Sequence, residues 1–586
     1  MLRGASRPLH SLMMDTANEH DSHADLTPNA FPRTDRANER LSTGASGAEV
    51  ASTPPPAAAS RRSAAWLTTP GAGWVATALA TLVAAAIRLP GLDNVRTLIF
   101  DETYYVKDAW SLLTLGYEGT WPKEYDASFV AGDVSGLSPV GGYPVHPPTG
   151  KWLIALGMKF FGQADPVGWR ITAAICGIVT VFLLCRLAQN LFRSPALTLL
   201  AGVFLATDGM AIVMSRTAIL DGFLAMFALA AFLCVVKDQQ SARRALVGKL
   251  ANWDGLGAPR SGLADLRSYM SRREKRVFVV GPNAGNRPWL FAAGICAGLA
   301  SSVKWSGIYV LAFLGLFVAL REVTCRWRAG HPTPIRGALL ADVWWAFILM
   351  VPTAILTYVA SWFGWFTHSA AHGHGRSGIA GFAGELADLW LYHKEMWTFH
   401  NGLNTPHTYQ SSPYTWLAQV RATSFYWNNG EAVMGCRSGK CASDVVALGN
   451  PLLWWVGIGA LLLVIVATFY YRNWRVGLIA LGYIALYVPW LAYAHRTIFV
   501  FYTVAFAPYV ALAVAWMIGL LAGWVTIDGS PEPAPASRQT QIAGWLFAGL
   551  VTAAILGCAL YFIPLWRGDV IDYDFWRAHM WLQSWI

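Results

Sequence analysis

Two adjacent carboxylates, Asp101 and Glu102, are the residues of this chain best suited to acid–base chemistry. They follow an apolar segment at 74–89, so we expect them close to the end of that segment. Side chains of sequence neighbours point in different directions, which allows the pair to hold two roles. A carboxylate near a hydroxyl can accept its proton during attack. The simpler alternative is an ordinary solvated acidic pair.

A second polar motif, His146-Pro-Pro-Thr-Gly-Lys151, stands directly before the next apolar segment. Its two prolines restrict the backbone and end the preceding loop, which leaves Lys151 where the apolar segment begins. Taken alone, the motif is equally consistent with a helix-entry turn and a lysine that extends toward water.

Several ionisable residues lie inside or at the edges of apolar segments. Such groups are costly in lipid, so they face an internal cavity, a partner or an anionic ligand. Any one of them can instead extend to the headgroups or pair with a neighbour, but together they predict a polar cavity inside a helical bundle. The residues are Arg88, Arg170, Arg216, Asp221, Lys304, His495 and Arg496.

One class of reaction fits this combination of residues. A sugar donor carried on a lipid phosphate needs a membrane groove for its tail and cations for its phosphate. Because phosphate is already a good leaving group, one carboxylate that accepts the proton of the attacking hydroxyl is sufficient. A glycosidase would instead need two carboxylates flanking the scissile bond.

The composition predicts an all-α integral membrane protein. Of the 586 residues 55% are hydrophobic and only 13% are charged, whereas soluble domains have about 25% charged residues. The apolar runs are close to the length that a helix needs to cross the hydrocarbon layer. The net charge of +10 comes from loops between these runs, so it indicates membrane topology and no nucleic-acid partner.

The apolar and polar segments suggest a domain organisation. An uncleaved first span is expected, because no signal peptide is recognised near Met1. The predicted parts are a disordered cytoplasmic tail at 1–65, an N-terminal catalytic membrane module at 66–363 with loops 91–147 and 237–288, a loop at 364–450, and a C-terminal membrane module at 451–586.

The basic loop 237–288 fixes the orientation, because Lys and Arg concentrate on the cytoplasmic side. Loops 91–147 and 364–450 are then extracytoplasmic, and the expected location is the plasma membrane. Four full spans between 147 and 237 would place loops 91–147 and 237–288 on the same side of the membrane. One of these apolar segments should therefore not fully span. We expect the exception in the region of Asp208, Arg216 and Asp221, which leaves about 11 transmembrane helices.

Loop 364–450 contains two further features. Cys436 and Cys441 bracket a polar stretch and are expected to form a disulfide if the loop faces an oxidising compartment; two free thiols are the alternative. His368, His372 and His374 lie close together in a Gly-rich stretch. A mobile loop is favoured over a metal site there, because no adjacent carboxylate completes a ligand set. The sequence identifies no certain cofactor and gives no indication of whether a divalent metal is required.

The order of these motifs resembles the protein O-mannosyltransferase family of the glycosyltransferase C class. The resemblance spans 88–502. The stretches that carry it are Phe100–Tyr105, His146–Lys151, Trp169–Gly177, Ser215–Asp221, Ser301–Gly307, His407–Tyr414 with Trp416, and His495-Arg496 before Phe501-Tyr502.

The resemblance implies a polytopic bundle that transfers mannose, with inversion, from polyprenyl-phosphate mannose to Ser or Thr of exported polypeptides. Asp101 would be the base, and Glu102 would help to hold the acceptor or the pocket. Membrane lipids and a meeting with the acceptor at the secretion translocon are expected too. The expected donor-phosphate ligands are Arg170, Lys304, Arg496 and His495; the expected supporting residues are Arg88, His146, Lys151, Arg216 and Asp221.

The chain departs from eukaryotic members of that family in loop 364–450, which is too short for their β-trefoil MIR domain and has no repeat of short strands. This favours a bacterial member, and the Ala-, Arg- and Trp-rich composition favours an actinobacterium. Two alternatives remain open. A related enzyme would use the same donor on a lipid or cell-wall glycan, and a transporter would also carry charges in the membrane but should show an internal repeat.

Overall fold

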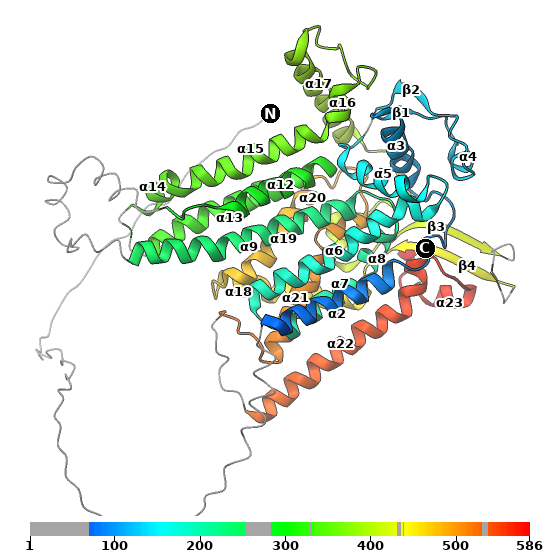
Figure 1. The fold of residues 1–586 in the computed structure, drawn as a ribbon. Helices are drawn as coiled ribbons and strands as arrows, with labels where there is room; N and C mark the ends of the chain where they lie inside the picture. Colours follow the sequence, from blue (N-terminus) through cyan, green and yellow to red (C-terminus); the bar gives the residue numbers. More distant parts are fainter. Residues whose placement is uncertain are drawn as a thin grey trace, which may run out of the picture. The chain divides into compact units, whose positions relative to one another are not determined.

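The computed structural model describes residues 70–143, 145–251, 283–328, 331, 333–430, 435–436, 439–529 and 537–586. These residues form a predominantly helical fold (Figure 1), as the composition predicts. The expected tail at 1–65 and most of the basic loop 237–288 lie outside the described residues.

The first half of the described chain contains Asp101 and most of the long helices. They are α2 (Pro70–Arg88), α3 (Glu102–Leu115), α4 (Asp126–Val130), α5 (Thr149–Phe161), α6 (Pro166–Phe192), α7 (Pro195–Ala206), α8 (Gly209–Arg216), α9 (Asp221–Ala251), α12 (Pro288–Val303), α13 (Gly307–Arg328), α14 (Pro334–Ala338), the π-helical turn η2 (Leu339–Val343) and α15 (Trp344–Ser361).

The second half begins with the extramembrane helices of loop 364–450 and continues with a second set of long helices. They are α16 (Phe363–Thr367), α17 (Gly381–Gly402), η3 (Pro413–Ala418), α18 (Pro451–Phe469), α19 (Trp474–Leu486), α20 (Val488–Ala492), η4 (Val500–Ala505), α21 (Ala507–Leu521), α22 (Arg538–Arg567), α23 (Tyr573–Ala578) and η5 (Gln583–Trp585).

Seven helical segments of the described chain are long and apolar enough to cross a membrane, and the bent pair α7–α8 makes eight if it counts as one span. Adding α9, α12 and α21 would reach the eleven expected from the sequence; that total stays a prediction. The helices α7 and α8 meet at 57°, beside Asp208, where the sequence predicts an interruption. The Asp208 carboxylate accepts a hydrogen bond from the Ala211 N–H at 3.1 Å and so starts α8.

Helix α5 is a second candidate for the segment that does not fully span. Helix α5 has 13 residues and is therefore only about 20 Å long, whereas the hydrocarbon layer is about 30 Å thick. Helix α9 has 31 residues. Either α5 or the bent pair α7–α8 can therefore account for the parity between 147 and 237, and the expectation that the exception lies around Asp208–Asp221 stays a prediction.

Two small antiparallel sheets add to the helices. One pairs β1 (Gly119–Thr120) with β2 (Ser138–Gly141), and the other has the order β3–β4–β5, with β3 (Thr423–Gly430), β4 (Cys441–Ala447) and β5 (Val570–Asp572). Loop 364–450 thus contributes a hairpin, which the sequence did not predict, because two short strands give little periodic signal.

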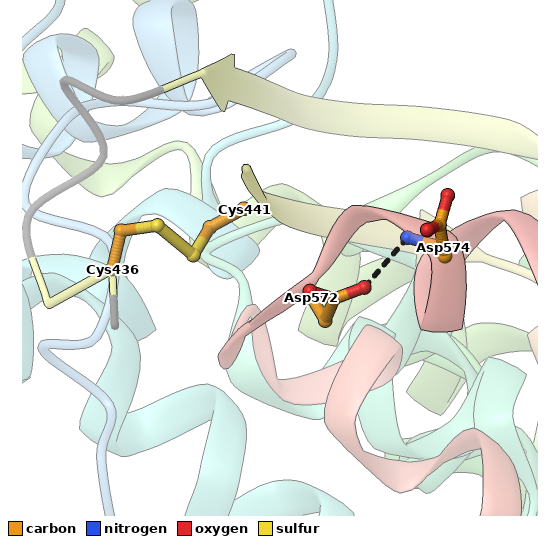
Figure 2. The surroundings of a disulfide bond; sticks show 4 residues. All are labelled: Cys436, Cys441, Asp572 and Asp574. Atoms are coloured by element: carbon orange, nitrogen blue, oxygen red, sulfur yellow. Dashed lines mark hydrogen bonds between the residues drawn. A yellow bond between two sulfur atoms is a disulfide. The ribbon is translucent and has the colours of Figure 1, made fainter. Parts of the chain in front are cut away.

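The disulfide Cys436–Cys441 closes the loop of this hairpin, as the sequence led us to expect. Figure 2 shows it beside Asp572, whose carboxylate accepts a hydrogen bond from the Asp574 N–H at 2.9 Å. Cys441 pairs with Asp572 across β4 and β5. The disulfide therefore lies where the hairpin joins the C-terminal strand.

Candidate active site

Asp101 lies at the start of α3, but its side chain does not cap that helix. The preceding residue, Phe100, has φ of 49°, a left-handed conformation that is uncommon for a bulky side chain. The Phe100 ring stacks on Phe425 at 4.7 Å and meets Phe499 and Phe501 edge-on at 5.6 and 5.5 Å. These aromatic contacts hold the unusual turn, which leaves the Asp101 carboxylate available for other partners.

The surroundings of Asp101 suit a proton acceptor. Burial raises the pKa of Asp101 to about 6, while the nearby Lys304 opposes this rise, Asp221 adds to it, and a hydrogen bond from Tyr105 opposes it. A carboxylate with a pKa of about 6 is ionised at neutral pH and is a stronger base than an exposed aspartate.

Two cations lie near this carboxylate. Lys304, at the end of α12, pairs with Asp221 at 2.7 Å and lies 4.9 Å from the centre of the Tyr502 ring. Arg496 is close enough to influence the charge state of Tyr502, His146 and His400.

Arg496 differs from the other candidate cations in its partners. Unlike Arg88, Arg170, Arg216 and Lys304, it makes no side-chain hydrogen bond or ion pair among the described residues; its Nε is buried, and its guanidinium lies 6.0 Å from the centre of the Tyr493 ring. A guanidinium with unused donors is suited to a phosphate oxygen. His495, its neighbour, is exposed and lies against Tyr493, with ring centres 6.4 Å apart.

Glu102 is bound by other groups of the protein. Its side chain is fully buried, and Arg170 donates to both carboxylate oxygens, at 2.8 and 2.7 Å. The N–H groups of Ile99 and Ala218 donate to the same carboxylate at 3.0 and 2.8 Å. Because protein groups occupy both oxygens, Glu102 joins α3, α6 and the α8–α9 connection. Of the two roles expected for Glu102, these contacts favour holding the pocket over holding the acceptor.

Arg170 is likewise occupied by the protein. Besides the Glu102 carboxylate, it donates to the backbone carbonyls of Leu92, Val95 and Thr97 at 2.9, 2.6 and 3.0 Å. No donor remains for a lipid phosphate, so the expected phosphate contact is corrected as well. Arg170 instead fastens the irregular segment 89–99.

The two other arginines also serve the backbone. Arg216 donates to the carbonyls of Arg88, Pro90 and Gly91 at 2.8, 2.7 and 2.5 Å. Arg88 donates to the carbonyl of Ala206 at 2.8 Å. Both residues therefore support the chain that leads into Asp101. The sequence predicts a supporting role for each of them.

The motif His146–Lys151 contributes to two separate places. Lys151 is buried and pairs with Asp108 and Glu118 at 3.3 and 3.2 Å, which joins α5 to α3. His146 stacks on His400 with ring centres 5.0 Å apart and lies 6.1 Å from the Tyr105 ring. Burial, and next the charge of Lys304, lower the pKa of His146 well below its usual value. The neutral His146 and His400 rings thus lie next to the Asp101 region.

Sequence reasoning missed the roles of Phe100, Tyr105, His400 and Tyr502. Phe100, Tyr105 and Tyr502 fall within recognised motifs, so their presence was noted but not their function. No local signal marks His400, because the stacking partner that brings it to the site is distant in sequence.

The three histidines of the Gly-rich stretch are held by separate partners. The His372 ring lies 3.4 Å from Glu395, and His374 pairs with Glu385 at 2.8 Å and stacks on Trp365 at 3.8 Å. His368 Nδ1 lies 2.8 Å from the Gly364 carbonyl oxygen. Within the described chain no three His, Cys, Asp or Glu side chains converge as a metal site. These contacts hold the three side chains apart on separate neighbours, and the mobile loop favoured from sequence stays a prediction.

Two family models match this chain. One is the dolichyl-phosphate-mannose-protein mannosyltransferase model, over residues 78–251. The other is the C-terminal four TMM region of protein-O-mannosyltransferase, over residues 385–585. The first match contains Asp101, and the second contains His400 and Arg496.

Similar curated proteins carry the name polyprenol-phosphate-mannose–protein mannosyltransferase. One from Mycolicibacterium smegmatis is 32% identical over 532 residues, covering 88% of this chain and 93% of that protein. One from Mycobacterium tuberculosis is 30% identical over 529 residues, covering 88% and 92%. One from Corynebacterium glutamicum is 29% identical over 528 residues, covering 87% and 92%. These actinobacterial relatives agree with the origin expected from composition.

A solved structure shares the fold. The S. cerevisiae protein O-mannosyltransferase Pmt1–Pmt2 complex bound to the sugar donor matches with a TM-score of 0.62 at 15% identity. The match covers 90% of this chain and 94% of that one. The similarity therefore extends through both halves of the helical fold.

Proposed function

The chain belongs to the protein O-mannosyltransferase family, and we propose that it transfers mannose from polyprenyl-phosphate mannose to Ser or Thr hydroxyls of polypeptides, with Asp101 as the base. The observation that carries this assignment of roles is the position of Asp101. Its buried carboxylate lies close to Lys304 and Asp221, and the buried Nε of Arg496 has no hydrogen-bond partner in the described chain.

The proposed reaction is a single displacement. The acceptor hydroxyl oxygen forms a bond to C1 of the mannose while the bond from C1 to the phosphate oxygen breaks, and its electron pair leaves with the polyprenyl phosphate. Asp101 accepts the hydroxyl proton. One free carboxylate suits direct displacement with inversion, because the other nearby carboxylate, Asp221, is paired with Lys304 at 2.7 Å.

The leaving phosphate gains negative charge as the C1–O bond breaks, so fixed cations stabilise the transition state. Arg496 supplies unused donors, and Lys304 supplies a charge held in place by Asp221. Asp221 is thus a positioning residue in this proposal.

We also propose an extracytoplasmic active site in the plasma membrane, with the N-terminus in the cytoplasm. The strand β3 touches the Asp101 segment through the Phe425–Phe100 stack, and the same hairpin contains the Cys436–Cys441 disulfide. Disulfides persist in oxidising compartments, so this contact supports an outward-facing Asp101. Exported polypeptides would then meet the enzyme as they leave the translocon, in contact with membrane lipids.

The test is mannose transfer by the purified protein from synthetic polyprenyl-phosphate mannose to a Ser/Thr peptide. Asp101→Asn should lower turnover by about 10²-fold or more while donor affinity stays within a few-fold. Asp133→Asn, the same change in an exposed part of the same loop, is the matched control and should keep full turnover. Full turnover by Asp101→Asn would remove Asp101 as the base, and transfer only to lipid or glycan acceptors would replace the polypeptide acceptor.

A further inference from the structure

The strand β3 has an open edge. It pairs with β4 on one side, and no strand of the described chain pairs with its other side. Natural edge strands are commonly protected by charged residues or proline, but β3 reads Thr-Ser-Phe-Tyr-Trp-Asn-Asn-Gly and has neither. The side chains of Trp427–Asn429 are exposed, so this stretch is the part of the edge that a partner can reach.

The start of this edge lies close to the segment that contains Asp101. Phe425, two residues before Trp427, stacks on Phe100, which directly precedes Asp101. The pairing register with β4 shifts between Ser424 and Tyr426, and such bulges re-aim a strand locally. A strand advances about 3.3 Å per residue, so an extended segment of about five residues beside Trp427–Asn429 would reach the start of β3.

The edge is held in place before any partner binds. The Ser424 hydroxyl and the Trp576 indole N–H both donate to Asp444 of β4 at 2.9 Å. The Trp427 ring packs on the Trp576 ring at 4.2 Å. Together with the disulfide at the start of β4, these contacts reduce the entropy that a binding partner would otherwise lose by ordering the strand.

We infer that the acceptor polypeptide binds as an added strand on the open edge of β3, which directs its Ser or Thr toward Asp101; this inference rests on the proposed function. An open strand edge offers backbone donors and acceptors at the spacing of another extended peptide, and strand addition is an established mode of peptide recognition. A lipid or a glycan has no matching repeat of amides. Recognition through the main chain tolerates many acceptor sequences, and side-chain preferences should alternate with a period of two.

The first experiment methylates each backbone nitrogen of one acceptor peptide in turn and measures transfer by the full-length enzyme. Methylation removes a donor, so the acceptor KM should rise about tenfold at alternate positions on one side of the acceptor hydroxyl. At the positions between them the KM should change little, and the donor KM should not change. Equal effects at all positions, with transfer to the unmodified peptide intact, would overturn strand addition and leave the proposed function standing. Absence of transfer to any peptide would remove both.

The second experiment places the peptide on β3. Asn428 and Asn429 are neighbours, so one N–H points toward β4 and the other toward the open edge. Asn428→Pro and Asn429→Pro each remove one of these donors, while Asn428→Ala and Asn429→Ala remove only side chains and serve as controls. Proline at the outward position should raise the acceptor KM well above that of the alanine variant at the same position, with donor affinity unchanged. An unchanged acceptor KM in both proline variants would exclude β3; if both fail to fold, the peptide series still decides whether a strand is added.

Discussion

At the scale of single residues, the charge state of Asp101 depends on groups that can be changed one at a time. Only its ionised form accepts a proton, so kcat/KM should fall about tenfold per pH unit below a pKa of about 6. Asp221 raises this pKa and Lys304 lowers it. Asp221→Asn should therefore move the acid limb of the profile to lower pH, and Lys304→Met should move it to higher pH. Shifts in the same direction would contradict this account.

The neighbours Asp101 and Glu102 should affect stability in opposite directions. Burial raises the folded-state pKa of Asp101 above its usual 3.8, so its ionised form destabilises the fold above pH 6, and this cost vanishes below pH 4. Asp101→Asn should thus stabilise the protein by roughly 1–3 kcal/mol at pH 7.5. Glu102→Gln leaves Arg170 as an unpaired buried charge and should destabilise by roughly 3 kcal/mol or more.

Thermal unfolding of the two variants in detergent at pH 7.5 and at pH 4.5 measures this contrast. The gain for Asp101→Asn should shrink at the lower pH. Asp133→Asn, which changes an exposed carboxylate, should show no gain at either pH. A loss of stability in Asp101→Asn at pH 7.5 would contradict the argument from burial.

The site illustrates what sequence can and cannot specify. The acidic motif and Lys304 were recognisable from residue type and position, and they do lie together. The assignment of Arg170 to phosphate failed because sequence does not show which carbonyls lack partners. The irregular segment 89–99 has carbonyls outside any helix, buried backbone groups require donors, and Arg170 and Arg216 supply them. Sequence also left the two roles of Glu102 open, because its partner comes from another helix.

At the scale of helices, a buried network of ion pairs holds one end of α9. Arg287 pairs with Asp238 at 2.5 Å and with Glu322 at 3.0 Å, and Arg321 pairs with the same two carboxylates. Removal of one partner from such a network leaves buried charge uncompensated. Arg287→Ala should therefore destabilise the protein by roughly 3–5 kcal/mol.

The catalytic rate per folded molecule should persist in Arg287→Ala. Asp238 lies about 25 Å along α9 from Asp221, at a rise of about 1.5 Å per residue. Thermal unfolding and an active-fraction-corrected kcat separate the two effects, with the exposed Arg243→Ala as the control. A proportional loss of kcat in the folded fraction would show that this network acts on the active site.

At the scale of the whole molecule, α9 connects Asp221 to the end that leads into the basic loop, so the two ends should face opposite sides of the membrane. Asp133 lies in the same predicted outer loop as Asp101, and Arg243 lies beyond Asp238; both are exposed. In intact cells, a membrane-impermeant thiol reagent should label Asp133→Cys, and Arg243→Cys should react only after the membrane is opened. The wild type controls for the free cysteines of the described chain, which are buried or half-buried. The reverse labelling pattern would place Asp101 in the cytoplasm and would contradict the proposed orientation. Because the hairpin contacts the Asp101 segment, its disulfide would then lie in the cytoplasm too, where a reducing environment opposes a stable disulfide.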